Sequence, residues 1–258
     1  MSGLYIETHG YGKPLVLVHG WGMHSKVWRD FALELAKDVQ VTLVDLPGHG
    51  HSVGLDDYSL TRVASELATT LTEPAIWLGW SMGGAVVLKL AHDYPDQIKG
   101  LMLVCSNPKY SCSSDWPTGM DSNLLNEFAQ AVRENDQITL ARFTGLMSQG
   151  EGELTRELLR LVRKLLPQAP TADRNALLWG LDVLQNADLR TIYKQIKYPL
   201  SVLLGENDPL IPSQVAKQLA LLNTNAEIHI VNNAGHLPFL SQQSEVLRLI
   251  TEFIQRID

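Results

Sequence analysis

The chain has 258 residues, which is long enough for one α/β domain with an inserted subdomain and a sizeable core. A hydrophobic fraction of 45% with 19% charged residues is typical of a globular protein and excludes a disordered or fibrous one. The formal net charge of -7 argues against general affinity for nucleic acid or anionic membranes, because both require a basic surface.

The sequence also indicates the compartment. No apolar run approaches the roughly 18 residues of a membrane helix, and the first ten residues, MSGLYIETHG, do not resemble a signal peptide. The two cysteines, Cys105 and Cys112, are too few for a disulfide framework, and Cys105 lies in an apolar run that favours a buried thiol. We therefore expect a cytoplasmic protein without a membrane segment.

The first half of the chain alternates strands with helices. Short apolar runs that end at Gly, Pro or Ser predict strands buried on both faces, at 14–20, 39–48, 75–81 and 99–106. Between them, apolar residues at helical spacing predict helices at 25–38, 59–71 and 83–95. This alternation predicts a mostly parallel central sheet flanked by helices, which is an α/β fold.

The rhythm changes after about residue 115. Only helices are predicted there, at 123–135, 137–149, 153–166 and 172–185. Strand and helix alternation then resumes, with segments at 200–205, 213–222, 226–231 and 244–257. We therefore expect a core formed by residues 1–115 and 189–258, divided by an all-helical cap, residues 116–188, that is inserted after the sixth strand.

A serine lies at the tightest bend of the chain. Residues 79–83, GWSMG, match G-x-S-x-G at the end of a predicted strand and the start of a helix, which is the context the motif requires. Gly79 and Gly83 permit the sharp turn because neither carries a Cβ. Ser81 is therefore the candidate nucleophile, and the backbone N–H of Met82 is placed to stabilise an oxyanion.

A second glycine-rich turn, residues 19–22, follows the first buried strand. In this context a backbone N–H of the loop supplies the other oxyanion donor, and Gly20 and Gly22 allow close approach to the serine. We expect Trp21 to be that donor, with its ring lining the pocket. His19 is better interpreted as a residue that braces the loop than as one that transfers protons.

The serine needs a base, and His236 is the best placed of the eight histidines. It follows the last predicted strand on a Gly-containing loop, and it follows the serine in chain order as hydrolases require. The others are placed on a strand, a loop or helix surfaces. His49 and His51 form H-x-H, but no H-E-x-x-H occurs, so no metal site is expected.

The histidine needs an acid, and Asp208 in the turn NDPLIP follows the penultimate strand. Glu206 is the near competitor, although it is better suited to capping the strand end or facing water. Asp45 follows an earlier strand and is interpreted as a turn carboxylate. The order Ser81, Asp208, His236 is that of the hydrolases.

With HGWG, GWSMGG, GENDPLIP and NNAGHLPF in order, the chain resembles the α/β-hydrolase superfamily over its whole length. The segments VDLPGHGHS, AIWLGWSMGG, DWP, ARF and LDVLQNADLR make it similar to the pimeloyl-[acyl-carrier protein] methyl ester esterases of biotin synthesis. The resemblance implies an α/β-hydrolase fold and a serine carboxylesterase that releases methanol and pimeloyl-acyl carrier protein.

The same resemblance implies roles for single residues. Ser81, Asp208 and His236 would form the triad, with Trp21 and Met82 flanking the oxyanion. The acyl channel would be lined by Phe143, Thr144, Gly145, Leu146 and Met147. Arginines of the cap would hold the acidic carrier protein, at Arg142, Arg156 and Arg160. Ile138 stands where the resemblance predicts a further arginine.

The spacing on residues 153–166 agrees with part of this. Arg156, Arg160 and Arg163 recur at i, i+4 and i+7 and so share one helical face, with leucines on another. Glu153 and Glu157 interleave, so an ordinary solvated face is the alternative. Attraction of an acidic partner by such a face would depend on salt.

Three alternatives to this function were considered. A short-chain carboxylesterase or a carbon-carbon bond hydrolase could use the same core, because the cap selects the substrate. A non-catalytic, hydrolase-like binding protein is disfavoured by the complete triad. A dinucleotide site at PGHGHSVG is rejected because its glycines miss the G-x-G-x-x-G spacing. We expect a monomer with small esters as side substrates and with no cofactor.

Overall fold

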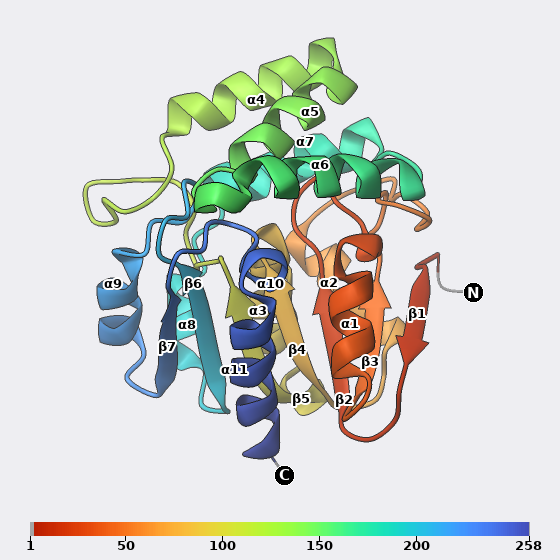
Figure 1. Ribbon diagram of the computed structural model, residues 1–258, viewed down its shortest axis with the longest axis vertical. Helices are drawn as coiled ribbons and strands as arrows, with labels where there is room; N and C mark the ends of the chain where they lie inside the picture. The colour runs from red at the N-terminus through yellow and green to blue at the C-terminus, as the bar shows by residue number, and fades with distance from the viewer. Residues whose placement is uncertain (1–2, 258) are drawn as a thin grey trace.

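The computed structural model describes residues 3–257 and contains one seven-stranded sheet, whose strands lie in the order β1-β3-β2-β4-β5-β6-β7 (Figure 1). The strands are β1 (Ile6–His9), β2 (Pro14–Val18), β3 (Gln40–Val44), β4 (Ala75–Trp80), β5 (Ile98–Val104), β6 (Leu200–Gly205) and β7 (Ala226–Val231). Only β1 is antiparallel to its neighbour, and all other pairs are parallel. The expected mostly parallel sheet is confirmed.

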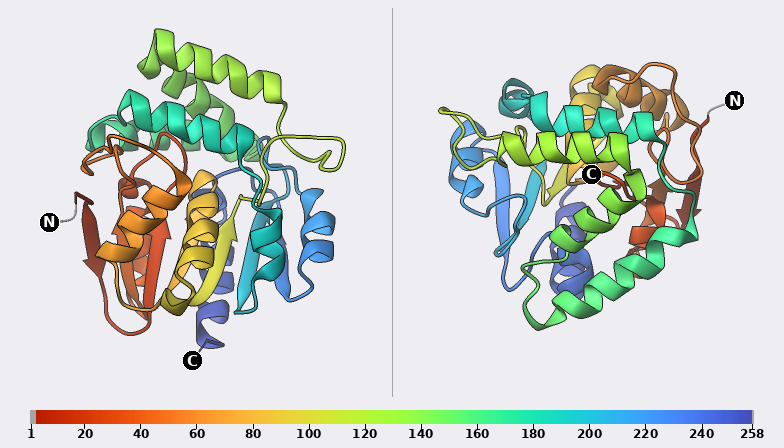
Figure 2. Two further views of the ribbon diagram at one scale, coloured as in Figure 1. Left: turned by 180° about the vertical axis from the view of Figure 1, so that it is seen from behind. Right: turned by 90° about the horizontal axis from the view of Figure 1, so that it is seen from above.

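Helices cover both faces of the sheet, which explains its apolar sequence. All six residues of β4 are buried, as expected for a strand with helices on either side. One face carries α1 (Arg29–Leu35) and α11 (Gln243–Gln255); the other carries α2 (Leu60–Thr70), α3 (Met82–Asp93) and α8 (Arg190–Gln195) (Figures 1 and 2). The helix α9 (Val215–Leu222) packs beside β7 at the sheet edge.

Four helices form a layer across one end of the sheet (Figure 1). They are α4 (Ser122–Glu134), α5 (Asp136–Met147), α6 (Thr155–Leu165) and α7 (Arg174–Asn186), close to the four predicted ranges. The side chains of Asp121, Asn135 and Asp173 accept hydrogen bonds from backbone N–H groups at the starts of α4, α5 and α7. These N-caps fix where three of the four helices begin.

The insertion follows the fifth strand, so the expectation of a sixth strand before it is wrong. The N-terminal part of the described chain supplies a single edge strand, β1, before the parallel strands begin. Residues 107–121 then run without a helix, held by isolated bridges that pair Ser111 with Met120 and Ser113 with Trp116. The remaining short elements are η1 (Ser25–Trp28), η2 (Pro95–Gln97), η3 (Gly152–Leu154), η4 (Leu166–Gln168) and α10 (Pro238–Ser241).

The strand order changes direction at β2. The chain passes from β2 to β3 on one side and then from β3 across β2 to β4 on the other side, which makes a topological switch point. Ligands of open α/β sheets bind outside the carboxyl ends of the strands at such a point. The loops after β2 and β4 meet there, beneath the four-helix layer. No helix within residues 3–257 is long and apolar enough to cross a membrane.

Candidate active site

Ser81 occupies a strained turn between β4 and α3. Its backbone has φ 54 and ψ -126, in a region that residues with a side chain rarely adopt. Its carbonyl accepts a hydrogen bond from Gly84 N at 2.9 Å, which starts the helix. A Cβ on Gly79 would collide with the carbonyl of Gly83, so the sharp bend requires glycine. The predicted nucleophile turn therefore has the geometry of a nucleophile elbow.

A buried tyrosine supports this turn from the far side. The hydroxyl of Tyr110 donates to the carbonyl of Ser81 at 2.6 Å and lies 2.7 Å from Ser106 Oγ. Burial raises the pKa of Tyr110, which keeps its hydroxyl protonated as a donor. Sequence analysis missed this contact because Tyr110 lies in an irregular loop with no spacing that relates it to Ser81.

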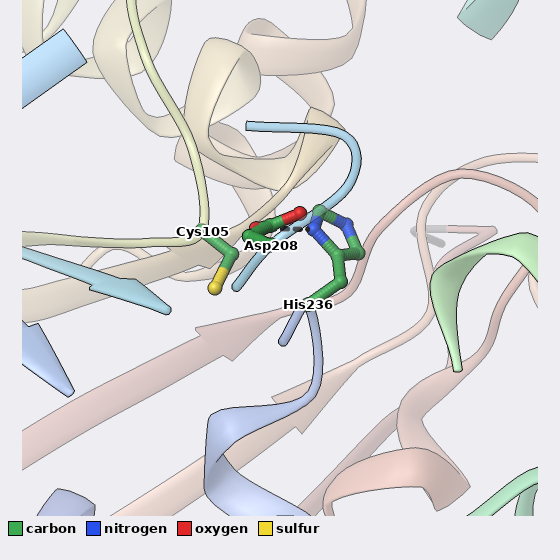
Figure 3. Close-up of side chains that lie close together, drawn as sticks. All are labelled: Cys105, Asp208 and His236. Carbon is green, nitrogen blue, oxygen red and sulfur yellow. Dashed lines mark hydrogen bonds and ion pairs between the residues drawn. The ribbon is translucent and has the colours of Figure 1, made fainter. Parts of the chain in front are cut away.

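Asp208 and His236 form a fully buried pair, shown in Figure 3. Asp208 Oδ2 lies 2.8 Å from His236 Nδ1, and neither side chain is exposed. The other oxygen of Asp208 accepts from the backbone N–H groups of Leu210 and Ile211, at 2.8 and 3.0 Å. With the carboxylate held in this way, the imidazole proton belongs on Nδ1 and Nε2 is left as an acceptor.

The same pair is tied to the serine turn through Trp80. The indole Nε1 of Trp80, which precedes Ser81 in the chain, donates to the carbonyl of His236 at 2.9 Å. Within the described residues, His236 Nε2 is buried without a hydrogen-bond partner, and no direct hydrogen bond joins it to Ser81. Contacts between nucleophile and base are often long in unliganded enzymes and tighten when substrate binds.

The loop after β2 lies against the serine, as its glycines suggested. A Cβ on Gly20 would be 3.0 Å from Ser81 Cβ and 3.3 Å from the Trp80 ring, which is closer than an ordinary contact. The buried indole of Trp21 donates to the carbonyl of Leu177 in α7 at 2.8 Å. Trp21 therefore links the loop to the helices above it.

Trp21 and Met82, the two candidate oxyanion residues, meet beneath α7. A Cβ on Gly180 would be 2.5 Å from Trp21 Cδ1 and 2.7 Å from Met82 Sδ. The Trp21 ring also packs edge-on against Phe143 of α5, with centroids 4.7 Å apart. Of the segment expected to line an acyl channel, Phe143 thus contacts a candidate oxyanion residue.

The other residues of that segment continue along α5. Thr144 and Met147 are buried, whereas Gly145 and Leu146 are half-buried. Thr144 Oγ1 donates to the carbonyl of Leu140 at 2.8 Å, so its hydroxyl is used within the helix. A Cβ on Gly145 would meet nothing within 4 Å, which leaves open space beside that position.

His19 braces the loop, as expected. Leu46 N donates to its Nε2 at 2.9 Å, so the proton lies on Nδ1, which is 2.8 Å from the carbonyl of Gly20. Burial, with a smaller contribution from His49, lowers the pKa of His19 to about 3. A histidine that stays neutral and has both nitrogens bonded is not placed to carry a proton between reacting groups.

The two competing acids have the local roles predicted for them. Asp45 accepts from the backbone N–H groups of Ser25 and His51, at 2.6 and 2.9 Å, and is a turn carboxylate. Glu206 Oε2 accepts from Asn233 N at 2.9 Å at the surface, where it caps the loop after β7. Neither side chain is hydrogen-bonded to the ring of a histidine within residues 3–257.

Cys105 completes a cluster with the acid and the histidine (Figure 3). Potential ligand atoms of Cys105, Asp208 and His236 lie within 4.8 Å of one another. Burial, followed by the charge of Asp208, raises the pKa of the Cys105 thiol, which donates to the carbonyl of Gly235 at 3.6 Å. Metal ions bind the thiolate and a histidine nitrogen free of protons, so this protonated, hydrogen-bonded group is a poor fit for a metal.

The three candidate docking arginines are exposed on two adjacent helices of the four-helix layer, α5 and α6. The guanidinium of Arg142 on α5 lies 6.0 Å from the centre of the Phe128 ring. Arg156 and Arg160 lie one turn apart on α6, and their side chains form no ion pair or hydrogen bond with any described residue. Ile138 on α5 is 60% exposed, so the position where an arginine was expected presents an apolar side chain to solvent.

Comparisons with known proteins agree with this fold. Residues 15–249 match the model of the alpha/beta hydrolase family. The chain therefore belongs to the alpha/beta hydrolase family. It is 41% identical over 252 residues to "Pimeloyl-[acyl-carrier protein] methyl ester esterase" of Methylococcus capsulatus, and the match covers 98% of each chain.

Solved structures with the same fold include two esterases. An esterase (EaEST) from Exiguobacterium antarcticum superposes with a TM-score of 0.87 at 20% identity, over 98% of this chain and 95% of the other. A thermophilic esterase from Thermogutta terrifontis gives 0.82 at 23% identity, over 98% and 93%. At this identity the likeness concerns the fold alone.

Proposed function

We propose that the protein is a serine carboxylesterase that hydrolyses the methyl ester of pimeloyl-acyl carrier protein to pimeloyl-acyl carrier protein and methanol, in biotin synthesis. The observation that carries the esterase chemistry is the buried Asp208–His236 pair beside the strained turn of Ser81. The substrate follows from the esterase of Methylococcus capsulatus, which is 41% identical over nearly the whole chain.

The proposed reaction transfers the acyl group in two steps. His236 Nε2 removes the hydroxyl proton of Ser81 as Ser81 Oγ attacks the ester carbonyl, and the protonated imidazole then gives that proton to the departing methanol. Water, deprotonated by the same nitrogen, next attacks the acyl-enzyme and releases the acid and Ser81. Asp208 stabilises the imidazolium, and its two backbone hydrogen bonds keep it in place.

Two backbone N–H groups would hold the oxyanion. Met82 N lies at the start of α3, where the helix dipole favours negative charge, and Trp21 N lies on the loop that passes against Ser81. Because the indole of Trp21 is anchored to Leu177 and its ring to Phe143, the position of this loop depends on α5 and α7.

The helices over the sheet would select the substrate. We assign residues 116–188 to a cap and residues 1–115 and 189–258 to the core. In this proposal the segment from Phe143 to Met147 lines the acyl channel, and Arg142, Arg156 and Arg160 dock the acidic carrier protein. Unpaired guanidinium groups on one surface suit an acidic partner. The protein would act as a cytoplasmic monomer, with small esters as side substrates.

A general short-chain carboxylesterase is the second candidate, and two observations favour it. Ile138 exposes an apolar side chain where a docking arginine was expected, and Glu153 and Glu157 are exposed near the arginines of α6. A cap with mixed charge attracts an acidic partner less strongly. A carbon-carbon bond hydrolase shares the triad as well, and substrate profiling distinguishes it from both esterases.

The decisive experiment is hydrolysis of a methyl-pimeloyl carrier conjugate by the wild type and by Ser81→Ala, with rescue of a biotin auxotroph in parallel. We expect the wild type to release methanol and to support growth, and the variant to do neither. If the wild type leaves the conjugate intact but hydrolyses p-nitrophenyl esters, the carrier substrate is wrong and the general esterase remains. If it hydrolyses neither, the esterase proposal itself is wrong.

A further inference from the structure

A buried glutamate outside the triad contacts the loop of the candidate base. Glu151 lies in the short connection between α5 and η3, yet only 2% of its surface is exposed. Its Oε1 accepts a hydrogen bond from the backbone N–H of Leu237, the residue after His236, at 2.9 Å. Its Oε2 is buried with no hydrogen-bond partner within residues 3–257. Burial of a carboxylate with so few partners is costly, so a specific role is expected.

The connection between α5 and η3 contacts the loop that carries Asp208 as well as the loop that carries His236. A Cβ on Gly235 would be 2.9 Å from Glu151 Oε1 and would collide with the carbonyl of Gln149. A Cβ on Gly150, whose φ is 82, would collide with the carbonyl of Asn207, the residue before Asp208. Residues 149–151, which we call the clamp segment, therefore lie close against the loops of both the acid and the base.

The loop that carries Asp208 is also hydrogen-bonded to the loop that carries His236. Asn207 N donates to the carbonyl of Ala234 at 2.9 Å, so the backbone beside Asp208 is bonded to the backbone before His236. The charge of Glu151 also contributes, after burial and Asp208, to the raised pKa of the Cys105 thiol, which places the carboxylate near that cluster. A displacement of the clamp segment would therefore move the partners of the Asp208–His236 hydrogen bond.

We propose that Glu151 is a positioning residue: by accepting the N–H of Leu237, it fixes the loop that orients His236 and couples the connection between α5 and α6 to the catalytic pair. The inference rests on the proposed catalytic role of Asp208 and His236. It also gives the cap a mechanical function, because α5 and α6, which carry the candidate docking arginines, are joined by the segment that holds the base in place.

A matched pair of variants tests the role of the acceptor. Glu151→Met keeps the length of the side chain and removes both oxygens, whereas Glu151→Gln keeps an oxygen that can accept from Leu237 N. With p-nitrophenyl butyrate, we expect Glu151→Met to lower kcat by about ten- to a hundredfold with little change in KM, because misplaced catalytic groups cost rate more than binding. We expect Glu151→Gln to keep most of the wild-type kcat.

Glu153→Gln is the control, because it removes the same charge from an exposed side chain two residues away and should leave kcat unchanged. The proton on His236 Nδ1, bonded to Asp208, provides a second readout as a downfield proton NMR signal. We expect this signal in the wild type and in Glu151→Gln, and a shifted or broadened signal in Glu151→Met.

The outcomes separate this inference from the proposed function. A folded Glu151→Met with wild-type kcat and an unchanged signal overturns the inference, as does a Glu151→Gln variant that is as impaired as Glu151→Met. If the wild type hydrolyses no ester but the signal still changes in Glu151→Met, the proposed function fails and the positioning role stands. If Glu151→Met does not fold, amide exchange of Leu237 in the wild type decides: slow exchange supports the hydrogen bond, and exchange as fast as in an exposed loop excludes it.

Discussion

Side chains at the carboxyl ends of the strands are held by many hydrogen bonds, whereas the arginines on the helices above them are not. At the sheet edge, Asp208 uses both carboxylate oxygens and the turn at Ser81 is bonded on two sides. On α6, by contrast, Arg156 and Arg160 are exposed and form no ion pair within residues 3–257. Groups that perform chemistry must be fixed before the substrate arrives, whereas groups that attract a partner must be free to meet it.

The largest effect should come from the nucleophile itself. Ser81→Ala removes the only hydroxyl proposed to attack the ester, so kcat for p-nitrophenyl butyrate should fall by about 10⁴-fold or more. The unfolding midpoint should stay close to that of the wild type, since the buried contacts of the turn come from its backbone. Activity that survives in a folded variant would assign the reaction to another residue.

The two acids after β6 provide the next test. Asp208→Asn should lower kcat by about 10³- to 10⁴-fold, because the amide cannot stabilise the imidazolium and favours the wrong tautomer. Glu206→Gln is the matched control, since Glu206 only caps a surface loop, and it should cost little activity. The reverse order of effects, measured as kcat under saturating ester, would identify Glu206 as the acid.

The buried histidine beneath the helices, His19, predicts a dependence of stability on pH. Because burial holds the pKa of His19 at about 3, compared with about 6.5 when unfolded, only the unfolded chain gains a proton between these values. Stability should therefore fall as pH drops, by about 2 kcal/mol from His19 alone between pH 7 and pH 5.

Urea unfolding of the wild type and of His19→Gln at pH 5, 6 and 7 measures this effect. The variant should be less stable at pH 7 and should show a shallower dependence on pH. The pKa values of His24 and His49 are also lowered by burial, so part of the slope should remain in the variant. Equal slopes in both proteins would contradict a neutral, buried His19.

The exposed arginines of α6 predict a selective effect on the carrier substrate. Reversing Arg156 and Arg160 to Glu should lower kcat/KM for the carrier conjugate about tenfold more than for a small ester, and the difference should shrink as salt screens the charges. The double variant Arg62→Glu with Arg248→Glu changes the net charge equally on α2 and α11, and it should not alter this ratio. Equal losses on both substrates would mean that the cap had been damaged.

The smallest effect concerns the open space beside Gly145. Because a Cβ there would meet nothing within 4 Å and the residue lies within α5, Gly145→Ala should raise the free energy of unfolding by up to about 1 kcal/mol. Thermal unfolding measures the change. A decrease would show that this part of α5 is more crowded than the structure indicates.

The parts of the site that the sequence predicted share one property. Ser81 comes directly after β4, while Asp208 and His236 lie in the loops that follow β6 and β7, and parallel strands bring their carboxyl ends to one side of the sheet. The spacing of apolar residues and the turn residues were therefore enough to place these residues, and the apolar spacing also predicted the four helices α4, α5, α6 and α7. Their boundaries shifted by a few residues because side-chain caps such as Asn135 decide where a helix starts.

Tyr110 and Glu151 could not be predicted in this way. Each reaches the site from an irregular segment, and each acts by bonding a backbone group, the carbonyl of Ser81 and the N–H of Leu237. Such contacts depend on how a loop folds back in three dimensions and leave no period in the sequence. The number of strands before α4 was predicted as six, whereas the structure has five among its described residues. The error concerns the N-terminal edge of the sheet, where the single strand β1 has only four residues and therefore little sequence pattern.

The anchoring of Trp21 bears on attempts to change specificity by exchanging caps between related hydrolases. Its backbone belongs to the loop beneath, but its ring is locked among Leu177, Phe143 and Gly180 of the helices above. A transplanted cap that lacks these contacts would leave the indole without its neighbours. It would then disturb the loop that carries the backbone N–H of Trp21. Chimaeras should therefore transfer Trp21 together with the helix residues that contact its ring.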